Sequence, residues 1–495
     1  MKYQPSQNTV PAPEFPKGLE WLNTGHPLSL RELRGKIVLL DFWTFCCINC
    51  MHIIPDLKKL EEKFPEELVV IGVHSAKFRN ERGTEQIRQA ILRYGIKHPV
   101  VNDRDFKIWS QYGVHSWPTL TLIDPNGNLA ASHSGEGAFD AFSNTIDQMI
   151  RYFDETGALS RTPLKLSPEA LSLPDTPLSF PGKIHADPTT KRLFITDSNH
   201  NRIVIAREDG AILDIIGSTR QGREDGPFEA AQLNHPQGTF LEEDSLYIAD
   251  TENHLIRVAN LKTRDVKTIL GTGEQARSFN VVGKGTQVAL NSPWDLVVLN
   301  NKLYMAMAGS HQLWVADLNS LEIRPHAGSG REGRIDGPLL GAALAQPSGI
   351  TTEGNRLYFA DSETSSIRWA DTDHHGNAGT IVGEDLFEFG DVDGSRPQAR
   401  LEHPLGIAWK DGLLYVADTY NSKIKIIDPT RGTSTTYAGT GKHGLKDGSR
   451  ARAEFSEPGG LAVLGDQIFV ADTNNHNIRV IDLKTEMVST LELKG

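Results

Sequence analysis

Three cysteines, Cys46, Cys47 and Cys50, are the only thiols in a chain of 495 residues. The last two are separated by Ile48 and Asn49, and this C-x-x-C spacing brings the second sulfur within reach of the first. In such a pair the first thiolate attacks a disulfide, and the second cysteine resolves the mixed disulfide. The cluster therefore predicts redox chemistry or metal binding rather than a structural disulfide.

The cysteines lie between a predicted strand and a predicted helix. Residues 36–43, KIVLLDFW, form the continuous apolar run that is typical of a buried parallel strand. Residues 47–64 carry Ile54, Leu57 and other apolar side chains at helical spacing. This order places Cys47 at a helix N-terminus, where unpaired amides and the helix dipole stabilise a thiolate.

Strands and helices alternate through the rest of residues 1–156. We expect a strand in ELVVIGVHS, a helix in TEQIRQAILRYG, a short strand in HPVVND, a short helix in DFKIWSQYG, a hairpin around a Pro-Asn-Gly turn and a helix in AFDAFSNTIDQMIRYF. This alternation predicts an α/β domain with a partly parallel sheet. Residues 157–177 are rich in proline and serine, which predicts a linker.

A repeat occupies residues 178–495. Segments such as LYIADTENHLI and IFVADTNNHNI recur six times at intervals of about 55 residues, each preceded by a proline. The residue at the fifth position of each segment is Asp197, Asp250, Met307, Asp361, Asp418 or Asp472. Each unit has about four short strand candidates separated by turn residues, which predicts a blade of a β-propeller. We therefore expect an all-β, six-bladed propeller. Whether residues near Leu178 add a strand to the last blade, or packing alone closes the ring, stays open.

The repeated Asp and Arg residues have a structural explanation. Arg257 and Arg479 follow Asp250 and Asp472 at a constant spacing, so an ion pair or turn cap within the blade is expected rather than a binding site. The third repeat departs from this pattern, because Met307 and Trp314 replace the aspartate and the arginine. The repeats resemble NHL repeats, with TENHLIRV as the most similar copy.

Residues 20–156 resemble the thioredoxin fold, in particular its TlpA-like branch. The sequence LDFWTFCCINC aligns without gaps with the thioredoxin sequence VDFWAEWCGPC. The resemblance implies that Asp41 is the buried proton-relaying aspartate, that Trp43 is the family tryptophan and that Pro118 is the cis-proline facing the cysteines. Cys46 replaces a tryptophan of the family, and Trp117 is a bulky residue in the cis-proline loop. Cys46, Trp43 and Trp117 are therefore supporting residues.

The order of a thioredoxin-like domain, CCINC at the helix start and an NHL propeller resembles the NHL-repeat-containing protein 2 family. The resemblance covers nearly the whole chain and implies its architecture more firmly than its activity. The first functional hypothesis is a thiol–disulfide oxidoreductase with Cys47 as nucleophile, Cys50 as resolving residue and no cofactor. Its propeller would bind a protein or peptide, and its electron donor is unidentified.

Three other functions stay open. Thr44 and Cys47 match the inner part of a peroxiredoxin motif, which suggests a thiol peroxidase, although Leu40 stands where the motif has proline. The protein could instead be a redox sensor or interaction scaffold. A metal site built from the thiols with His52 or His74 has the weakest support. If there is no metal site, we expect His52, His74 and His115 to be partly exposed polar residues.

Charge and local hydropathy indicate the class of partner and the cellular compartment. The formal net charge of -12 disfavours nucleic acid as the main partner. The first residues lack the apolar core of a signal peptide, and no stretch approaches the roughly 20 apolar residues of a membrane span. We therefore expect a cytoplasmic protein without a membrane partner.

Overall fold

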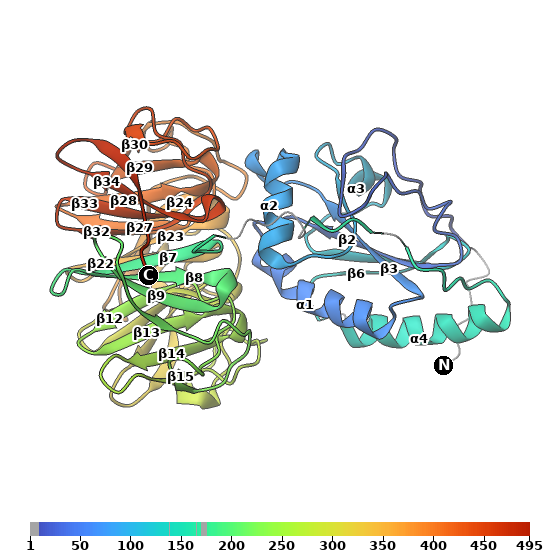
Figure 1. Ribbon diagram of the computed structural model, residues 1–495, viewed down its shortest axis with the longest axis horizontal. Helices are drawn as coiled ribbons and strands as arrows, with labels where there is room; N and C mark the ends of the chain where they lie inside the picture. Colours follow the sequence, from blue (N-terminus) through green and yellow to red (C-terminus); the bar gives the residue numbers. More distant parts are fainter. Residues whose placement is uncertain (1–8, 138, 165, 170–175) are drawn as a thin grey trace. The chain divides into compact units, whose positions relative to one another are not determined.

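The computed structural model describes residues 9–137, 139–164, 166–169 and 176–495. The chain divides into two compact units, residues 1–175 and residues 176–495 (Figure 1). In the described part of the chain, no helix is both long enough and apolar enough to cross a membrane.

The first unit is built on a mixed six-stranded sheet with the order β1-β4-β3-β2-β5-β6. Its strands are β1 (Trp21–Leu22), β2 (Ile37–Trp43), β3 (Leu68–His74), β4 (Val100–Asn102), β5 (Thr119–Ile123) and β6 (Leu129–Ser134). Strands β2, β3 and β4 are parallel, whereas β5 and β6 form the predicted antiparallel hairpin. All residues of β2 and β3 are buried, as expected of apolar runs inside a parallel sheet. The predicted α/β fold is confirmed.

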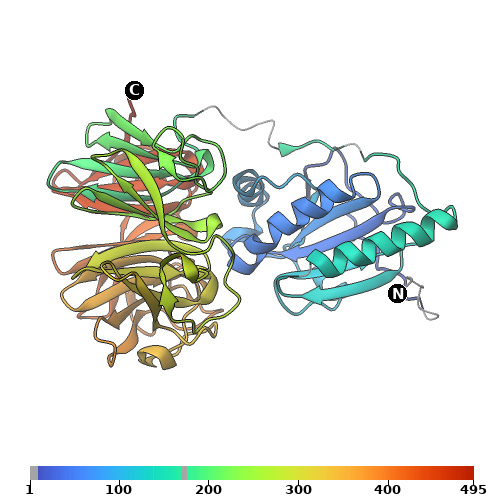
Figure 2. The ribbon, with the colours of Figure 1, turned by 90° about the horizontal axis from the view of Figure 1, so that it is seen from below.

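Helices cover the sheet of the first unit. They are α1 (Ile48–Lys63), α2 (Thr84–Tyr94), α3 (Lys107–Gln111) and α4 (Phe139–Glu155), with the 3₁₀ helix η1 (Asn80–Arg82) before α2. Helices α1 and α4 lie on one face of the sheet (Figure 2), where Leu57, Leu60 and Ile146 join one apolar core with β2 and β3. The helix predicted over residues 47–64 is thus confirmed, and its apolar side faces the sheet.

Residues 156–164 and 166–169, which follow α4, make hydrogen bonds and a β-bridge with the rest of the first unit. The Ser160 N–H donates to the Gly35 carbonyl over 2.8 Å, and Leu166 forms a β-bridge with Thr24. Arg88 donates to the Glu169 carboxylate over 2.8 Å. Residues 165 and 170–175 of the predicted linker lie outside the described residues.

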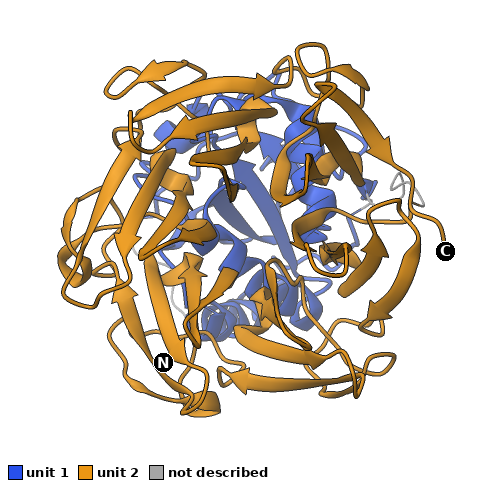
Figure 3. Ribbon diagram, turned by 90° about the vertical axis from the view of Figure 1, so that its left-hand side faces the viewer, with its two compact units in different colours: residues 1–175 blue, residues 176–495 orange. Residues whose placement is uncertain are grey.

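Residues 176–495, all of which the structure describes, form six antiparallel sheets around a central axis (Figure 3). The innermost strands are β7 (Pro181–Asp187), β12 (Thr239–Glu242), β17 (Pro293–Leu299), β22 (Pro347–Glu353), β27 (Gly406–Lys410) and β32 (Pro458–Leu464). The second strands are β8 (Arg192–Asp197), β13 (Ser245–Asp250), β18 (Lys302–Met307), β23 (Arg356–Asp361), β28 (Leu413–Asp418) and β33 (Gln467–Asp472). The third strands are β9 (Arg202–Arg207), β14 (Leu255–Asn260), β19 (Gln312–Asp317), β24 (Ser366–Asp371), β29 (Lys423–Asp428) and β34 (Asn477–Asp482). The fourth strands are β10 (Ile212–Ile216), β15 (Asp265–Leu270), β20 (Glu322–Ala327), β25 (Asn377–Val382), β30 (Thr433–Ala438) and β35 (Met487–Leu491). The predicted six-bladed propeller is confirmed.

Five blades carry an additional short outer strand. These strands are β11 (Gly226–Pro227), β16 (Gly283–Lys284), β21 (Gly337–Pro338), β26 (Gly394–Ser395) and β31 (Gly448–Ser449). Four of them begin at the last glycine of a Gly-x-x-Asp-Gly element, which therefore belongs to the blade that follows it in sequence. In blade one, Lys494 occupies this edge instead and bridges to Ala211.

A 3₁₀ helix follows the second strand of each blade. These helices are η3 (Ser198–His200), η4 (Thr251–Asn253), η6 (Ala308–Ser310), η8 (Ser362–Thr364), η9 (Thr419–Asn421) and η10 (Thr473–Asn475). Two further 3₁₀ helices, η5 (Gly285–Gln287) and η7 (Leu339–Gly341), precede blades three and four. In five blades, all except blade three, the hydroxyl of the first residue of this 3₁₀ helix donates to a proline carbonyl of the next blade; the Thr251 hydroxyl, for example, donates to the Pro293 carbonyl over 2.7 Å.

The same contact closes the ring between blades six and one. The Thr473 hydroxyl donates to the Pro181 carbonyl over 2.8 Å, and the Phe180 N–H donates to His476 Nδ1 over 3.1 Å. Leu178 is buried in the apolar core shared by these two blades and belongs to no strand. Packing and side-chain hydrogen bonds therefore close the propeller, which resolves the alternative that the sequence leaves open.

Candidate functional site

Cys47 and Cys50 lie where β2 ends and α1 begins. Cys47 is the N-cap residue of α1, and its carbonyl accepts a hydrogen bond from the Cys50 N–H over 3.0 Å. Its side chain is partly exposed, whereas Cys50 is only 1% exposed. All three cysteines are free thiols. One accessible sulfur and one shielded sulfur at a helix N-terminus match the geometry expected of a nucleophile and a resolving cysteine.

Cys50 resists ionisation. Burial raises the pKa of its thiol well above the usual value, and the hydrogen bond with Cys47, the charge of Cys47 and the charge of Asp41 add to this effect. A hydrogen bond from the Thr44 N–H to the Cys50 sulfur opposes it. Cys50 therefore needs a base that removes its proton before it can act as a nucleophile.

Asp41 is placed to be such a base. It lies in the middle of β2, opposite Gly72 of β3 and Leu120 of β5, and is 2% exposed. Burial raises the pKa of its carboxyl from 3.8 to about 7, although the positive charge of His98 acts in the opposite direction. Asp41 Oδ1 accepts no hydrogen bond from the described residues. A buried carboxyl with this pKa can hold or accept a proton at neutral pH.

Trp43 forms part of a buried aromatic cluster with His74 and Phe45, and Phe45 directly precedes the cysteines. Its ring meets His74 edge-on, with 5.0 Å between ring centroids, and Phe45 stacks on His74 at 5.3 Å. The Trp43 ring also needs the absence of a side chain at Gly72, where a Cβ would lie 2.9 Å from Trp43 Nε1. Trp43 therefore supports the loop through packing.

The prediction that His74 is a partly exposed polar residue is wrong. It is the last residue of β3, whose two faces are covered, and its side chain is fully buried. Burial lowers the pKa of His74 to about 3, so the ring is neutral at physiological pH. His52 is mostly buried and lies 2.7 Å from the Glu136 carboxylate, whereas His115 is exposed.

Pro118 lies at the same end of the sheet as Cys47. The peptide bond between Trp117 and Pro118 is cis, as the thioredoxin resemblance implies. The next residue, Thr119, pairs with Phe42 in the register of β5 and β2. Because β2 continues directly into the cysteine loop, this register brings the cis-proline loop and the cysteines to one edge of the sheet.

Trp117 is held by packing. Its indole Nε1 donates to the Ser75 carbonyl over 3.0 Å, and its ring centroid lies 4.6 Å from that of Trp109 and 6.2 Å from that of Phe106. The ring is partly exposed. These contacts fix the side chain beside the cis-proline backbone.

Glu81, which no sequence pattern marks, directly contacts the loop from Thr44 to Cys46, here called the cysteine loop. Its carboxylate is fully buried and accepts hydrogen bonds from the Cys46 N–H over 2.8 Å and from the Thr44 hydroxyl over 2.8 Å. It also accepts from the Lys77 N–H over 3.0 Å and the Phe78 N–H over 2.9 Å. Glu81 lies in a polar stretch, KFRNER, that has the composition of a solvated loop, so no local pattern marks it.

This network also bears on Cys46 and on the peroxidase hypothesis. Cys46 is 1% exposed, and its sulfur lies 3.8 Å from Thr44 Oγ1. The Thr44 hydroxyl donates to Glu81, so it is not directed to Cys47 as a peroxide-binding group would be. Cys46 is accordingly a buried neighbour of Cys47 and Cys50.

Among the described residues, no three His, Cys, Asp or Glu side chains are arranged to hold a metal ion.

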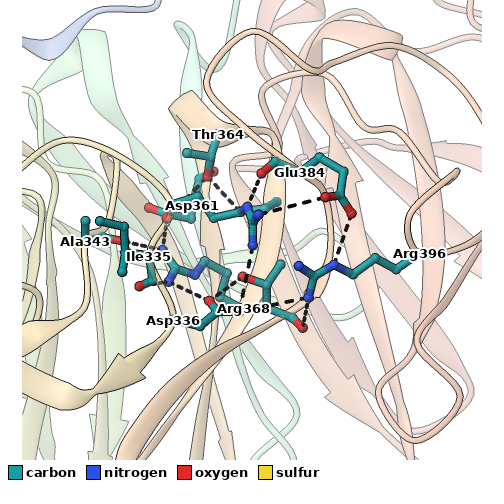
Figure 4. Close-up of polar contacts among 11 residues, drawn as sticks. Ile335, Asp336, Ala343, Asp361, Thr364, Arg368, Glu384 and Arg396 are labelled. Atoms are coloured by element: carbon teal, nitrogen blue, oxygen red, sulfur yellow. Dashed lines mark hydrogen bonds and ion pairs between the residues drawn. The ribbon is translucent and has the colours of Figure 1, made fainter.

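The repeated Asp and Arg of the propeller form the predicted ion pair in blades two, four and six. In blade four, Arg368 is fully buried and donates to Asp361 over 2.8 Å and to Asp336 over 3.1 Å (Figure 4). It also donates to the carbonyls of Ala343 and Ile335. Asp336 is the aspartate of the Gly-x-x-Asp-Gly element, so this network fastens the short outer strand to the blade.

Blade three replaces the whole network with apolar residues. Val282 stands at the position of Asp336, Met307 at that of Asp361 and Trp314 at that of Arg368. Met307 and Trp314 are buried in one apolar core. A buried ion pair and a well-packed apolar group can be of similar stability, which explains why the aspartate and the arginine change together. Val282 is 72% exposed and does not belong to this core.

Comparisons with known proteins agree with these two units. A thioredoxin-like family model matches residues 35–129, and an NHL repeat model matches residues 455–481. The chain is 42% identical to NHL repeat-containing protein 2 of Homo sapiens, over 98% of this chain and 72% of the human protein. It is 43% identical to Protein SUPPRESSOR OF QUENCHING 1, chloroplastic, of Arabidopsis thaliana, over 99% of this chain and 48% of the plant protein. The thiol-disulfide oxidoreductase ResA of Halalkalibacterium halodurans is 31% identical over 26% of this chain and 68% of its own length. This chain thus spans about half the length of the plant relative.

Proposed function

The chain belongs to the NHL repeat-containing protein 2 family, and we propose that it is a thiol–disulfide oxidoreductase whose propeller binds protein partners. One observation carries this proposal. The accessible Cys47 caps α1, and the shielded Cys50 lies one helical turn away, close enough to Asp41 for its charge to raise the pKa of the Cys50 thiol. The relatedness of residues 35–129 to thioredoxin-like proteins supports the same chemistry.

In the proposed reaction, the Cys47 thiolate attacks one sulfur of a substrate disulfide. The substrate's S–S bond breaks, the departing thiolate takes up a proton, and Cys47 is left in a mixed disulfide. Asp41 then removes the Cys50 proton, and the Cys50 thiolate attacks the Cys47 sulfur. The second substrate thiol leaves, so the two electrons of the dithiol have reduced the substrate and a Cys47–Cys50 disulfide remains. An unidentified thiol donor restores the dithiol.

The propeller contributes binding rather than catalysis in this proposal. Its repeated charged residues, such as Arg257 with Asp250 and Asp225, already satisfy one another within a blade. The remaining surface is therefore available to a protein or peptide, which a propeller can hold at high local concentration near a redox domain on the same chain. We place the protein in the cytoplasm, where a reducing environment returns the cysteine pair to the dithiol.

Redox titration of the full chain in glutathione buffers, followed by peptide mapping, tests the proposal. We expect one two-electron transition that joins Cys47 to Cys50 and leaves Cys46 as a thiol, because adjacent cysteines close only a strained ring. The transition should disappear in Cys47→Ser and Cys50→Ser variants and persist in the Cys46→Ser control. A chain that forms no such disulfide, or mainly a Cys46–Cys47 bridge, would contradict the assignment and favour a scaffold role.

A further inference from the structure

Glu81 links two loops beneath the redox pair. Its carboxylate accepts hydrogen bonds from Thr44 and Cys46, in the loop that leads to Cys47. It also accepts hydrogen bonds from the N–H groups of Lys77 and Phe78, in the loop that follows β3. All four groups donate to the carboxylate, which is the pattern expected of an ionised carboxyl group. A negative charge is thus held one residue from the nucleophilic cysteine.

We propose that Glu81 is a positioning residue that fixes the loop from Thr44 to Cys46 and, through its charge, opposes thiolate formation at the redox pair. This inference rests on the proposed oxidoreductase function.

Thr44 connects Glu81 with the geometry of the cysteine pair. Its hydroxyl donates to Glu81 while its main-chain N–H donates to the Cys50 sulfur. Glu81 therefore determines the orientation of the residue that places a hydrogen bond on Cys50. It also fixes the Cys46 N–H, so the chain enters the N-cap of α1 in one conformation.

The effect of the Glu81 charge depends on the other ionisable groups near Cys47 and Cys50. Asp41 from β2 is another buried acid, Cys47 and Cys50 lie at the start of α1, and His74 at the end of β3 is neutral because burial lowers its pKa to about 3. His98, whose positive charge lowers the pKa of Asp41, pairs with Glu61, whereas His74 carries no charge that could offset Glu81. A carboxylate next to the pair disfavours a second negative charge on sulfur, and thiols that ionise less readily form a more stable, less oxidising disulfide.

The test compares Glu81→Gln, Glu81→Asp and the matched control Glu85→Gln in the full chain. Glu85 is another carboxylate of the same unit, which lies in the first turn of α2 and accepts a hydrogen bond from Gln89 over 3.1 Å. The readouts are the pH profile of Cys47 alkylation by iodoacetamide and the midpoint potential in glutathione buffers. Urea unfolding of each variant measures stability separately.

Loss of the charge in Glu81→Gln should accelerate alkylation at pH 7 by about threefold or more, equivalent to half a pKa unit, and should make the midpoint potential less reducing. Glu81→Asp, which keeps the charge, should stay within about twofold of the wild type in alkylation rate, and Glu85→Gln should match the wild type. An unchanged alkylation profile and potential in a folded Glu81→Gln protein would overturn the inference, even if stability falls.

If Glu81→Gln does not fold, an alkylation profile of Glu81→Asp that differs strongly from the wild type would count against the charge effect. A wild-type chain that forms no Cys47–Cys50 disulfide would refute the proposed function, whereas the alkylation profiles would still report on Glu81.

Discussion

Replacing Asp41 with asparagine should stabilise the protein at high pH. Burial raises the pKa of Asp41 from 3.8 to about 7, so the folded state keeps a proton that the unfolded chain releases between these two values. Because the folded state binds more protons, the free energy of unfolding falls as pH rises from about 4 to about 7. A pKa shift of about three units lowers the free energy of unfolding by about 4 kcal/mol above pH 7.

The asparagine amide is still a buried polar group, which reduces this gain. We expect Asp41→Asn to raise the free energy of unfolding by about 2 to 4 kcal/mol at pH 8 and by less than about 1 kcal/mol at pH 4. The assay is urea unfolding of the reduced full chain at both pH values, followed by hydrogen exchange of peptides from β2 and α1. This readout isolates the first unit from the propeller.

Asp105→Asn serves as the control. The Asp105 side chain is 63% exposed, and the substitution removes the same charge from the same unit. It should leave stability nearly unchanged at both pH values. Equal effects of Asp41→Asn at pH 4 and pH 8, or a loss of stability at pH 8, would refute the assignment of a buried carboxyl that titrates near neutrality.

Three further predictions concern the thiols, the blade network and ring closure. Because burial and nearby charge raise the pKa of the Cys50 thiol, Cys50 in a Cys47→Ser variant should alkylate at pH 8 at least about tenfold more slowly than Cys47 in a Cys50→Ser variant; equal rates would contradict this. Arg368→Ala should lower the free energy of unfolding of the propeller by about 3 to 5 kcal/mol in urea, since it leaves Asp361 buried without its charged partner, whereas Asp361→Met combined with Arg368→Trp, the pair found in blade three, should cost less. Thr473→Val should cost about 1 to 2 kcal/mol and speed hydrogen exchange in β7, while Thr251→Val should do so in β17; the reverse pattern would be evidence against this mode of closure.

Local patterns in the sequence predict most of the architecture. The apolar run of β2 and the helical spacing of Leu57 and Leu60 place Cys47 at the start of α1, as the structure has it. The repeats predict six blades, because each repeat carries its own strands and turns. The constant spacing of Asp250 and Arg257 predicts their ion pair, since residues on paired neighbouring strands meet at a fixed register.

Features that depend on distant partners are not visible in the same way. Glu81 contacts Thr44 and Cys46, which lie more than thirty positions earlier, and its own surroundings are polar. Val282 is recognisable as the counterpart of Asp336 only after the fold shows that it precedes the short outer strand β16 of blade three. The contact between Thr473 and Pro181 joins the two ends of the propeller, so no local pattern identifies it.

The central claim is that Cys47 exchanges disulfides with protein partners, and covalent trapping tests it most directly. A full-length Cys50→Ser variant cannot resolve its mixed disulfide, so it should retain partners through Cys47 when it is incubated with cell extract and alkylated. We expect discrete reducible adducts that disappear in the Cys47→Ser/Cys50→Ser double variant and persist in Cys46→Ser/Cys50→Ser. Absence of any adduct that depends on Cys47 would contradict the account.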